Sequence, residues 1–592
     1  MKLRILKYFV IYFLFLLFCS CAKIGSPTGG PADKIPPKIL KSIPENGAIN
    51  FKGDKIYLTF DEYIQLNKIN ENLIISPPLK NDIKTTIRHK TLIINLNNKL
   101  EDSVTYCLNF GSSIVDFREA NPIENFEFVF STGSKIDSFS ITGKVLKAFD
   151  LEPPDKNTYV LIYNNLNDTA PLKVRPLYVG RCDKNGDFKI NYLKDGKYRI
   201  YALTDKNNNL KYDLKDEYFA FVDTIVEIND KIFKNNKIYL IDSTIIDSAK
   251  VDSLMKQQNF ESIYTTSINL KLFKEEERNQ YILSKNRPDS IKIVVNFNRS
   301  LFDDNFNFNL LDLKPSSDKW YLKEINKQKD TVTIWLIDST LFAHDTLMTI
   351  VKYSILDTSD NYIEKIDTIN FIYYGRKELK NKQIEKNFKI KLNTSLQGQG
   401  IKELDEDLYI ISPFPIKRID KELFTLQKFQ DTIYKEIPII ADIDTLNKRI
   451  IRIKADLKPG EKYKLIAKEE AIKSFYNHYN DTLNILFECR KEDYYGKLIL
   501  NFDRNYKDVI IQLLNMKGKI VKEEKLGDRK KLIFNYLQPG QYKLKAYFDK
   551  NNNNKWDTGN YRKKIQPEEV IFYQGSIDIR SNWEIEINWQ IF

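Results

Sequence analysis

Histidine and cysteine are scarce in this chain, whose 592 residues include three His and five Cys. A His-rich metal site and a scaffold stapled by disulfides both need more of these residues, so neither is the basis of the fold. Three cysteines lie beyond residue 21, far apart in the sequence and odd in number: Cys107, Cys182 and Cys489. We interpret them as buried thiols.

Blocks of like charge and long helical tracts are also missing. The formal net charge is +12, but basic and acidic residues are interleaved, as in EKNFKIKL, with no run of five like charges. We therefore expect no nucleic-acid partner. The 34 Tyr and 36 Phe favour strands, and 42% hydrophobic residues exclude a largely disordered chain. At 592 residues the chain should form several β-rich domains.

Recognisable catalytic motifs are absent from the sequence. His89, His344 and His478 each stand without a second His or Cys at ligand spacing, and no H-E-x-x-H, G-x-S-x-G or C-x-x-C occurs. The five Trp are too scattered to suggest a sugar-binding platform. We predict a protein that is not an enzyme. Because 80 acidic residues offer many carboxylate pairs, a glycoside hydrolase-like enzyme is the least favoured alternative.

Residues 1–20 have the pattern of a signal peptide. Lys2, Arg4 and Lys7 precede an apolar run over 9–19, and 11 helical residues rise only about 16 Å, too little for an ordinary membrane span. Ser20 and Cys21 then complete a segment that resembles a bacterial lipoprotein signal peptide. The resemblance implies lipid attachment at Cys21, with 21–37 as a flexible Gly/Pro-rich tether. A plain signal peptide cleaved elsewhere is the alternative.

Short alternating strands separated by turns begin near residue 39 and predict a β-sandwich over 38–135. The stretch PPKILKSIPENGAINFKGDKIYLTFDEYIQL resembles the bacterial Ig-like domain at the start of many Bacteroidetes lipoproteins. The residues that carry the resemblance are Pro36, Pro37, Ser42, Pro44, Asn46, Gly47, Phe60, Asp61 and Glu62. It implies an Ig-like fold and a Bacteroidetes envelope source, and it implies no reaction.

Two segments of the chain repeat one another. Residues 198–213 align without a gap with residues 542–557. The surrounding pattern D-x-x-G-x-F, followed by L-x-x-G-x-Y, resembles prealbumin-like domains, including the regulatory-type domain of carboxypeptidases. The matching residues are Asp183, Gly186, Phe188, Leu193, Gly196 and Tyr198 in the first copy, and Leu537, Gly540 and Tyr542 in the second. This resemblance implies small β-sandwiches over 138–235 and 494–592.

The strand pattern alone divides the rest of the chain. We predict a linker or short helix over 236–265, a divergent Ig-like β-sandwich over 266–376 and a third β-sandwich over 384–490. The predicted fold class is therefore all-β, with tandem Ig-like and prealbumin-like sandwiches after a lipoprotein signal peptide.

Each repeat contains a D-x-N-x-N-x-x-x-D loop. Oxygen-bearing side chains recur at positions 1, 3, 5 and 9: Asp205, Asn207, Asn209 and Asp213, then Asp549, Asn551, Asn553 and Asp557. This is the spacing of a calcium loop, and Ca²⁺ is the one candidate cofactor. However, Leu210 and Asn554 replace the usual Gly at position 6, and Glu217 falls at position 13 instead of 12. Calcium affinity would then be weak, and an Asn/Asp turn without metal is the alternative.

These features predict a non-catalytic outer-membrane lipoprotein that acts as a binding or scaffolding module of the cell envelope. Its partners would be the membrane, through the lipid anchor, and an envelope protein or a glycan. A surface adhesin or glycan-binding protein is the alternative. Acidic residues directly after the lipidated Cys accompany surface export in Bacteroidetes lipoproteins, whereas here the first acidic residue is Asp33. A periplasm-facing location is therefore favoured.

Overall fold

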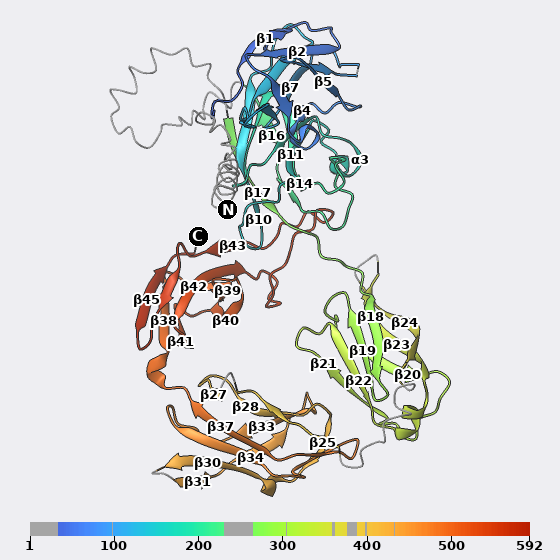
Figure 1. The fold of residues 1–592 in the computed structure, drawn as a ribbon, viewed down its shortest axis with the longest axis vertical. Coiled ribbons are helices and arrows are strands. Elements are labelled where there is room, and N and C mark those ends of the chain that lie inside the picture. Colours follow the sequence, from blue (N-terminus) through green and yellow to red (C-terminus); the bar gives the residue numbers. More distant parts are fainter. Residues whose placement is uncertain are drawn as a thin grey trace, which may run out of the picture. The chain divides into compact units, whose positions relative to one another are not determined.

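The computed structural model describes residues 33–97, 99–229, 265–303, 305–357, 361–375, 388–396, 400–430 and 433–591 (Figure 1). Strands dominate, which confirms the predicted all-β class. The α-helices in these ranges, α2 (Ile69–Asn72) and α3 (Ala170–Lys173), have four residues each, and no described helix is long and apolar enough to cross a membrane. The predicted signal peptide, Cys21 and most of the 236–265 linker lie outside the described residues.

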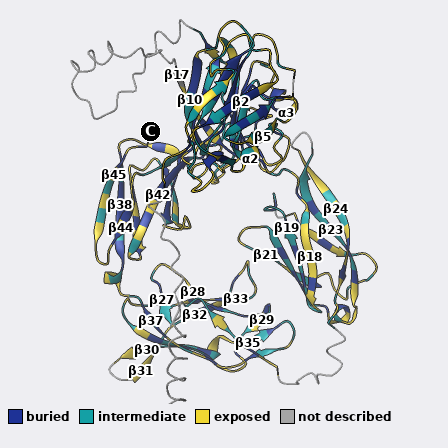
Figure 2. Cartoon of the chain, turned by 45° about the horizontal axis from the view of Figure 1, so that its top comes forward, coloured by how far each residue is buried: buried dark blue, intermediate teal, exposed yellow. Residues whose placement is uncertain are grey.

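The described residues divide into two compact units. The first holds residues up to 147 and 152–272, and the second holds 148–151 and the residues from 273 onward. Each unit contains separate hydrophobic cores, one for each β-sandwich. In Figure 2 the buried positions alternate with exposed ones along many strands, as expected where one face of a sheet is covered.

The first sandwich of the first unit (39–131) places the sheet β1-β2-β6-β5 against the sheet β4-β7-β9, with β3-β8 as a two-stranded ribbon. In β2, Ile56, Leu58 and Phe60 are fully buried, and the residues between them face outward. The strands are β1 (Ile39–Ile43), β2 (Lys55–Phe60), β3 (Ile64–Leu66), β4 (Ile74–Ser76), β5 (Lys84–Arg88), β6 (Thr91–Asn95), β7 (Thr105–Asn109), β8 (Ile114–Asp116) and β9 (Glu127–Ser131).

The second sandwich of the first unit spans 139–272, and we call it the first repeat sandwich. Its sheets are β13-β10-β17 and β12-β11-β14-β15, and β16 also pairs with β14. The strands are β10 (Phe139–Lys147), β11 (Thr158–Tyr163), β12 (Tyr178–Arg181), β13 (Asp187–Leu193), β14 (Gly196–Thr204), β15 (Phe219–Phe221), β16 (Val226–Ile228) and β17 (Thr265–Leu272).

The position of β17 corrects one predicted boundary. The sequence pattern assigns residues from 266 onward to the next sandwich, but β17 pairs in parallel with β10, eight residues against eight. Residues 265–272 therefore complete the first repeat sandwich. An isolated strand pattern does not reveal its pairing partner, because that partner lies more than 100 residues earlier in the chain.

The second unit begins with a sandwich over 282–372, which we call the middle sandwich, followed by one over 389–489. The middle sandwich pairs β18-β19-β22-β21 and β20-β23-β24. Its strands are β18 (Ile282–Asp289), β19 (Lys292–Phe297), β20 (Asn307–Leu310), β21 (Tyr321–Ile325), β22 (Thr331–Leu336), β23 (Thr346–Leu356) and β24 (Tyr362–Ile372).

The sandwich over 389–489 consists of many short strands. They are β25 (Lys389–Ile390), β26 (Asn393–Thr394), β27 (Ile401–Lys402), β28 (Leu408–Ile411), β29 (Ile416–Ile419), β30 (Phe424–Gln430), β31 (Ile433–Ile437), β32 (Ile440–Ile443), β33 (Ile450–Lys454), β34 (Lys462–Ala467), β35 (Ile472–Ser474), β36 (Tyr479–Asn480) and β37 (Leu483–Cys489).

The last sandwich (496–589), the second repeat sandwich, has the strand order of the first. Its sheets are β41-β38-β45 and β40-β39-β42-β43, with β44 also on β42, and β45 pairs in parallel with β38. The strands are β38 (Gly496–Phe502), β39 (Tyr506–Asn515), β40 (Ile520–Gly527), β41 (Lys531–Leu537), β42 (Gly540–Phe548), β43 (Val570–Phe572), β44 (Ile577–Ile579) and β45 (Glu584–Trp589). The sequence repeat is thus a repeat of a whole sandwich.

Two carboxylates, one half-buried and one buried, join consecutive sandwiches of the second unit. Glu324 on β21 accepts hydrogen bonds from both arms of Arg449, at 2.9 and 2.6 Å, and one from the indole of Trp335 at 2.9 Å. Glu403 accepts from the hydroxyl of Tyr495 at 2.5 Å and from Arg490 at 2.9 Å. Bidentate, charge-assisted bonds of this kind restrict orientation more than single surface ion pairs do.

Candidate functional site: the two repeated loops

The two D-x-N-x-N-x-x-x-D loops occupy the same place in their sandwiches. The first begins directly after β14 and the second directly after β42, each with an aspartate. Asp205 and Asp549 are both fully buried despite their charge. A buried carboxylate needs hydrogen-bond donors, and in both loops the backbone supplies them.

In the first loop, Asp205 accepts hydrogen bonds from three backbone N–H groups of its own loop. Oδ1 accepts from Asn207 at 3.2 Å and from Asn209 at 3.3 Å, and Oδ2 accepts from Leu210 at 2.7 Å. The side-chain amides of Asn207 and Asn209 donate to the two oxygens of Asp213, at 3.0 and 2.7 Å. All four predicted residues of this loop are therefore brought together.

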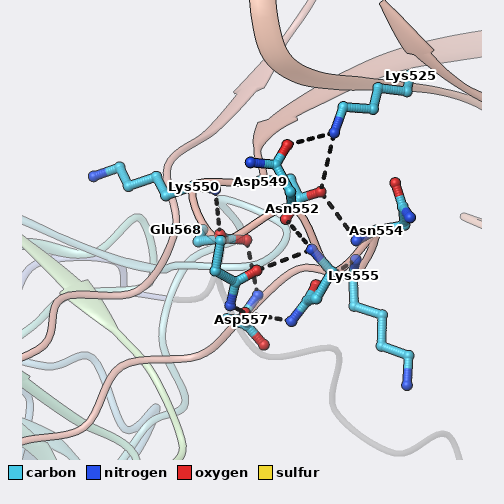
Figure 3. Close-up of polar contacts among 10 residues, drawn as sticks. Lys525, Asp549, Lys550, Asn552, Asn554, Lys555, Asp557 and Glu568 are labelled. Carbon is cyan, nitrogen blue, oxygen red and sulfur yellow. Dashed lines mark hydrogen bonds and ion pairs between the residues drawn. The ribbon is translucent and has the colours of Figure 1, made fainter. Parts of the chain in front are cut away.

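The second loop repeats this arrangement (Figure 3). Asp549 accepts from the backbone N–H groups of Asn553 and Asn554, both at 3.0 Å. The amides of Asn551 and Asn553 donate to Asp557 at 2.5 and 2.8 Å. Lys525 adds a positive charge, because its Nζ lies 3.9 Å from the Asp549 carboxylate and donates to Asn552 at 2.6 Å.

The missing glycine at position 6 does not prevent the sharp turn. Leu210 and Asn554 have φ values of 57° and 59°, and Asn208 and Asn552, two positions earlier, have 58° and 60°. Left-handed backbone costs a non-glycine residue about 1–2 kcal/mol, least for Asn. Bonds from the loop backbone to Asp205 or Asp549 offset this cost.

A buried glutamate closes each loop, and the sequence spacing singled out Glu217 but not Glu568. Glu217 accepts from the backbone N–H groups of Lys206 at 3.1 Å and Asp213 at 3.3 Å. Glu568 accepts in the same way from Lys550 at 2.8 Å and Asp557 at 3.0 Å (Figure 3). Burial raises the pKa of both carboxyl groups, although these hydrogen bonds oppose it.

The two glutamates lie at the same place in the fold, although their distances in sequence from the first aspartate of the loop differ. They stand at positions 13 and 20 counted from the first aspartate, but each lies two residues before the next strand, β15 or β43. An alignment that starts from these strands, with the motifs EYFAFV and EEVIFY, would have paired them.

Aromatic residues at position 8 anchor the loops to their sandwiches. Tyr212 is buried and stacks on Phe219 with ring centroids 4.3 Å apart. Trp556 donates from its indole to the carbonyl of Glu568 at 2.9 Å and packs edge-on against Phe149 at 5.0 Å. Both therefore serve the packing of the loop.

The loop geometry is compatible with both interpretations of the sequence. For a calcium ion to bind, the Asn207 and Asn209 amide oxygens must turn from backbone N–H groups toward the cation. Among the described residues, no group of three or more His, Cys, Asp or Glu is arranged to hold a metal ion. Calcium binding and the metal-free turn both stay predictions.

A cavity of about 550 Å³ adjoins the first loop within the first unit. Arg181 and Tyr159 line it together with apolar side chains such as Leu73 and Leu210. Its volume lies in the range of small-ligand pockets. The guanidinium of Arg181 already has a hydrogen-bond partner within the protein, because it donates to the Tyr159 hydroxyl at 3.0 Å.

The cysteines and histidines have no shared site among the described residues. Cys107, Cys182 and Cys489 are free and buried, as predicted. Burial raises the pKa of Cys182 to about 12, so its thiol stays protonated at neutral pH.

One family model matches the chain, the bacterial Ig-like domain, over residues 33–132. This confirms the Ig-like assignment of the first sandwich. No curated protein sequence matches the chain.

Solved structures of three other proteins match parts of this chain. The major pilin subunit of Bacillus cereus (variant D312A) has 11% identity over 76% of this chain and 98% of its own, with a TM-score of 0.13. The S-layer protein rSbsC has 10% identity over 87% and 64%, and the BSP domain of a biofilm associated protein has 9% over 71% and 94%, both with TM-scores of 0.13. Likeness at this level does not bear on function.

Proposed function

We propose that this chain is a lipid-anchored envelope protein that serves as a non-catalytic binding or scaffolding module at the outer membrane. The observation that carries the proposal is the order of its N-terminal features. A signal-like segment ends at Cys21, and a bacterial Ig-like domain begins only 12 residues later, at residue 33.

The architecture supports a scaffold. Each sandwich has its own core, and the loops at sandwich ends vary while packed sheets hold them in place. Within the second unit, the Glu324–Arg449 and Glu403–Tyr495 bonds restrain consecutive sandwiches. Restrained modules present binding surfaces at set spacings, which suits assembly with an envelope protein.

Lipid attachment is tested by substituting Cys21. The wild-type chain should incorporate radiolabelled palmitate and fractionate with the outer membrane, whereas Cys21→Ala should incorporate none. Cys19→Ala is the matched control, because it removes a thiol two residues away and should keep the label. No label on the wild-type chain would favour a plain signal peptide, and label retained in Cys21→Ala would mean that the lipid is attached to another residue; either result would contradict the proposal.

The side of the membrane is tested by protease treatment of intact and lysed cells that express the tagged chain. Protection until lysis supports a periplasm-facing scaffold, and cross-linking should then capture an envelope protein. Digestion on intact cells instead supports the adhesin or glycan-binding alternative, which a glycan array would examine next.

A further inference from the structure

The first and last strands of the first repeat sandwich are direct neighbours. β10 and β17 pair in parallel from Ser140–Thr265 to Lys147–Leu272 without a register shift. The chain therefore enters the sandwich at one end of this strand pair and leaves it at the opposite end. Tension along the chain pulls the two strands past each other.

This loading direction determines mechanical strength. Sliding two parallel strands strains all their ladder hydrogen bonds at once, whereas peeling strands apart from one end breaks them singly. The middle sandwich lacks such a pair among its described strands, because β18 and β24, its first and last, lie in different sheets. It should yield under a smaller force.

The contact between β10 and β17 is unusually close at Gly143. A Cβ atom placed there would lie 1.8 Å from the carbonyl oxygen of Ile268, so only glycine fits this approach. Ile268, Leu270 and Leu272 of β17 are buried in the sandwich core. Sliding β17 would therefore also expose these three side chains to water.

In the second repeat sandwich, the first and last strands also form a parallel pair. β38 and β45 pair in parallel over six residues, from Lys497–Glu584 to Phe502–Trp589. The close contact of Gly496 differs from that of Gly143, because a Cβ at Gly496 would lie 2.5 Å from Cγ2 of Ile579 on β44 and 2.6 Å from the carbonyl oxygen of Arg580, which precedes β45.

We propose that the first repeat sandwich is a tension-bearing link, in which the parallel β10–β17 pair holds the chain together when a load pulls on the segments before Phe139 and after Leu272. The strength of the strand pair does not depend on the lipid anchor, but the load that it would carry rests on the proposed function. A tether between a membrane and a partner carries such a load whenever the two move apart.

Single-molecule stretching of the chain from residue 22 onward, with handles at both ends, tests the proposal. The first repeat sandwich spans 134 residues and the other four span 91–101. Its rupture should therefore release about 440–480 Å of chain, against about 300–360 Å for each of the others. We expect the long event to require more force than the first short event in each trace. A long event that comes first would overturn the proposal.

Two core truncations separate mechanical strength from general stability. Leu270 lies in β17, whereas Ile200 lies in β14, outside the parallel pair. Both side chains are buried, so Leu270→Ala and Ile200→Ala are comparable truncations. Leu270→Ala should lower the force of the long event clearly more than Ile200→Ala does. Equal losses would mean that strength follows overall stability, and the proposal would fail.

A second pair of variants keeps the test decisive if truncation prevents folding. Gly143→Ala should weaken the long event only, and Gly496→Ala should weaken one of the short events only. A disulfide identifies which rupture is the long event. Lys144 and Asn269 are direct partners in the β10–β17 pair, so Lys144→Cys combined with Asn269→Cys can link the two strands. Oxidation should abolish this event, and reduction should restore it. A folded Gly143→Ala chain with an unchanged long event would contradict the proposal.

Discussion

The two repeat sandwiches have the same strands in the same order, but the outer faces of their larger sheets are built differently. In the aligned repeats, Tyr201 of β14 corresponds to Lys545 of β42. Tyr201 packs against Tyr163 and Phe219, at centroid distances of 5.6 and 5.4 Å. Lys545 is 2% exposed, and its Nζ lies 3.1 Å from the ring centroid of Phe149.

The comparison shows that one backbone frame can tolerate an aromatic ring or an ammonium group at the same buried position, depending on what covers it. Residues 148–151 belong to the second unit, where Leu151 joins Ile510, Tyr547 and Val570 in a small cluster. The loops differ as well, because Tyr212 is buried in the first and Trp556 is half-buried in the second.

The largest expected difference concerns these two aromatic residues. Tyr212→Ala should destabilise the first repeat sandwich by about 3–5 kcal/mol, because it removes a buried ring stacked on Phe219. Trp556→Ala should cost its sandwich less, since the indole is partly exposed. Hydrogen exchange of β15 and β43 in the whole chain measures each opening free energy separately. A larger loss at Trp556 would reverse the comparison.

The buried aspartates should behave alike in the two sandwiches. Asp205→Ala and Asp549→Ala each leave backbone N–H groups of the loop without their acceptor, at a cost of about 3 kcal/mol. Asn207→Ala and Asn551→Ala are milder controls, because these side chains are exposed. Hydrogen exchange of the loop amides would detect the change. Unequal losses from the two aspartates would show that Lys525 alters the second loop.

Lys545 should make the stability of the second repeat sandwich depend on pH. Burial lowers the pKa of Lys545 to about 8, below the value of about 10.4 in an unfolded chain. Between these values the unfolded state binds more protons, so stability should rise as pH increases from about 8 to 10. Lys545→Met should remove this rise and add about 2 kcal/mol at pH 7. Denaturation followed at β42 over this range checks both effects.

The smallest expected effect is that of calcium on the loops. With a dissociation constant of about 1 mM, 10 mM calcium would add about 1.4 kcal/mol to a native loop. Slower hydrogen exchange at 209–213 and 553–557 in calcium, relative to chelator and to magnesium, would support binding. Asp213→Ala and Asp557→Ala should each abolish the effect in their own loop. If 10 mM calcium does not slow the exchange of these amides, the loops are turns that bind no metal.

Much of the fold followed from local patterns. The alternation in KIYLTF predicted a strand, whose Ile56, Leu58 and Phe60 are buried, and the repeat of 198–213 at 542–557 predicted two equivalent loops. The predicted residues of each loop do converge. Glu217 and Glu568 were not predicted as a pair, because their different distances along the chain conceal a shared position in space.

The sequence by itself determined the all-β class, the Ig-like first sandwich and the repeat, because side-chain alternation and turn residues act over a few neighbouring positions. Only the tertiary structure decided that β17 belongs with β10 and that Leu210 adopts a left-handed conformation. It also decided that a lysine is buried at position 545. The strand pairing and the buried lysine depend on groups distant in sequence, a ladder partner and a covering ring, on which local patterns carry no information. The conformation of Leu210 depends on the carboxylate of Asp205, five residues earlier, which is fully buried in the fold.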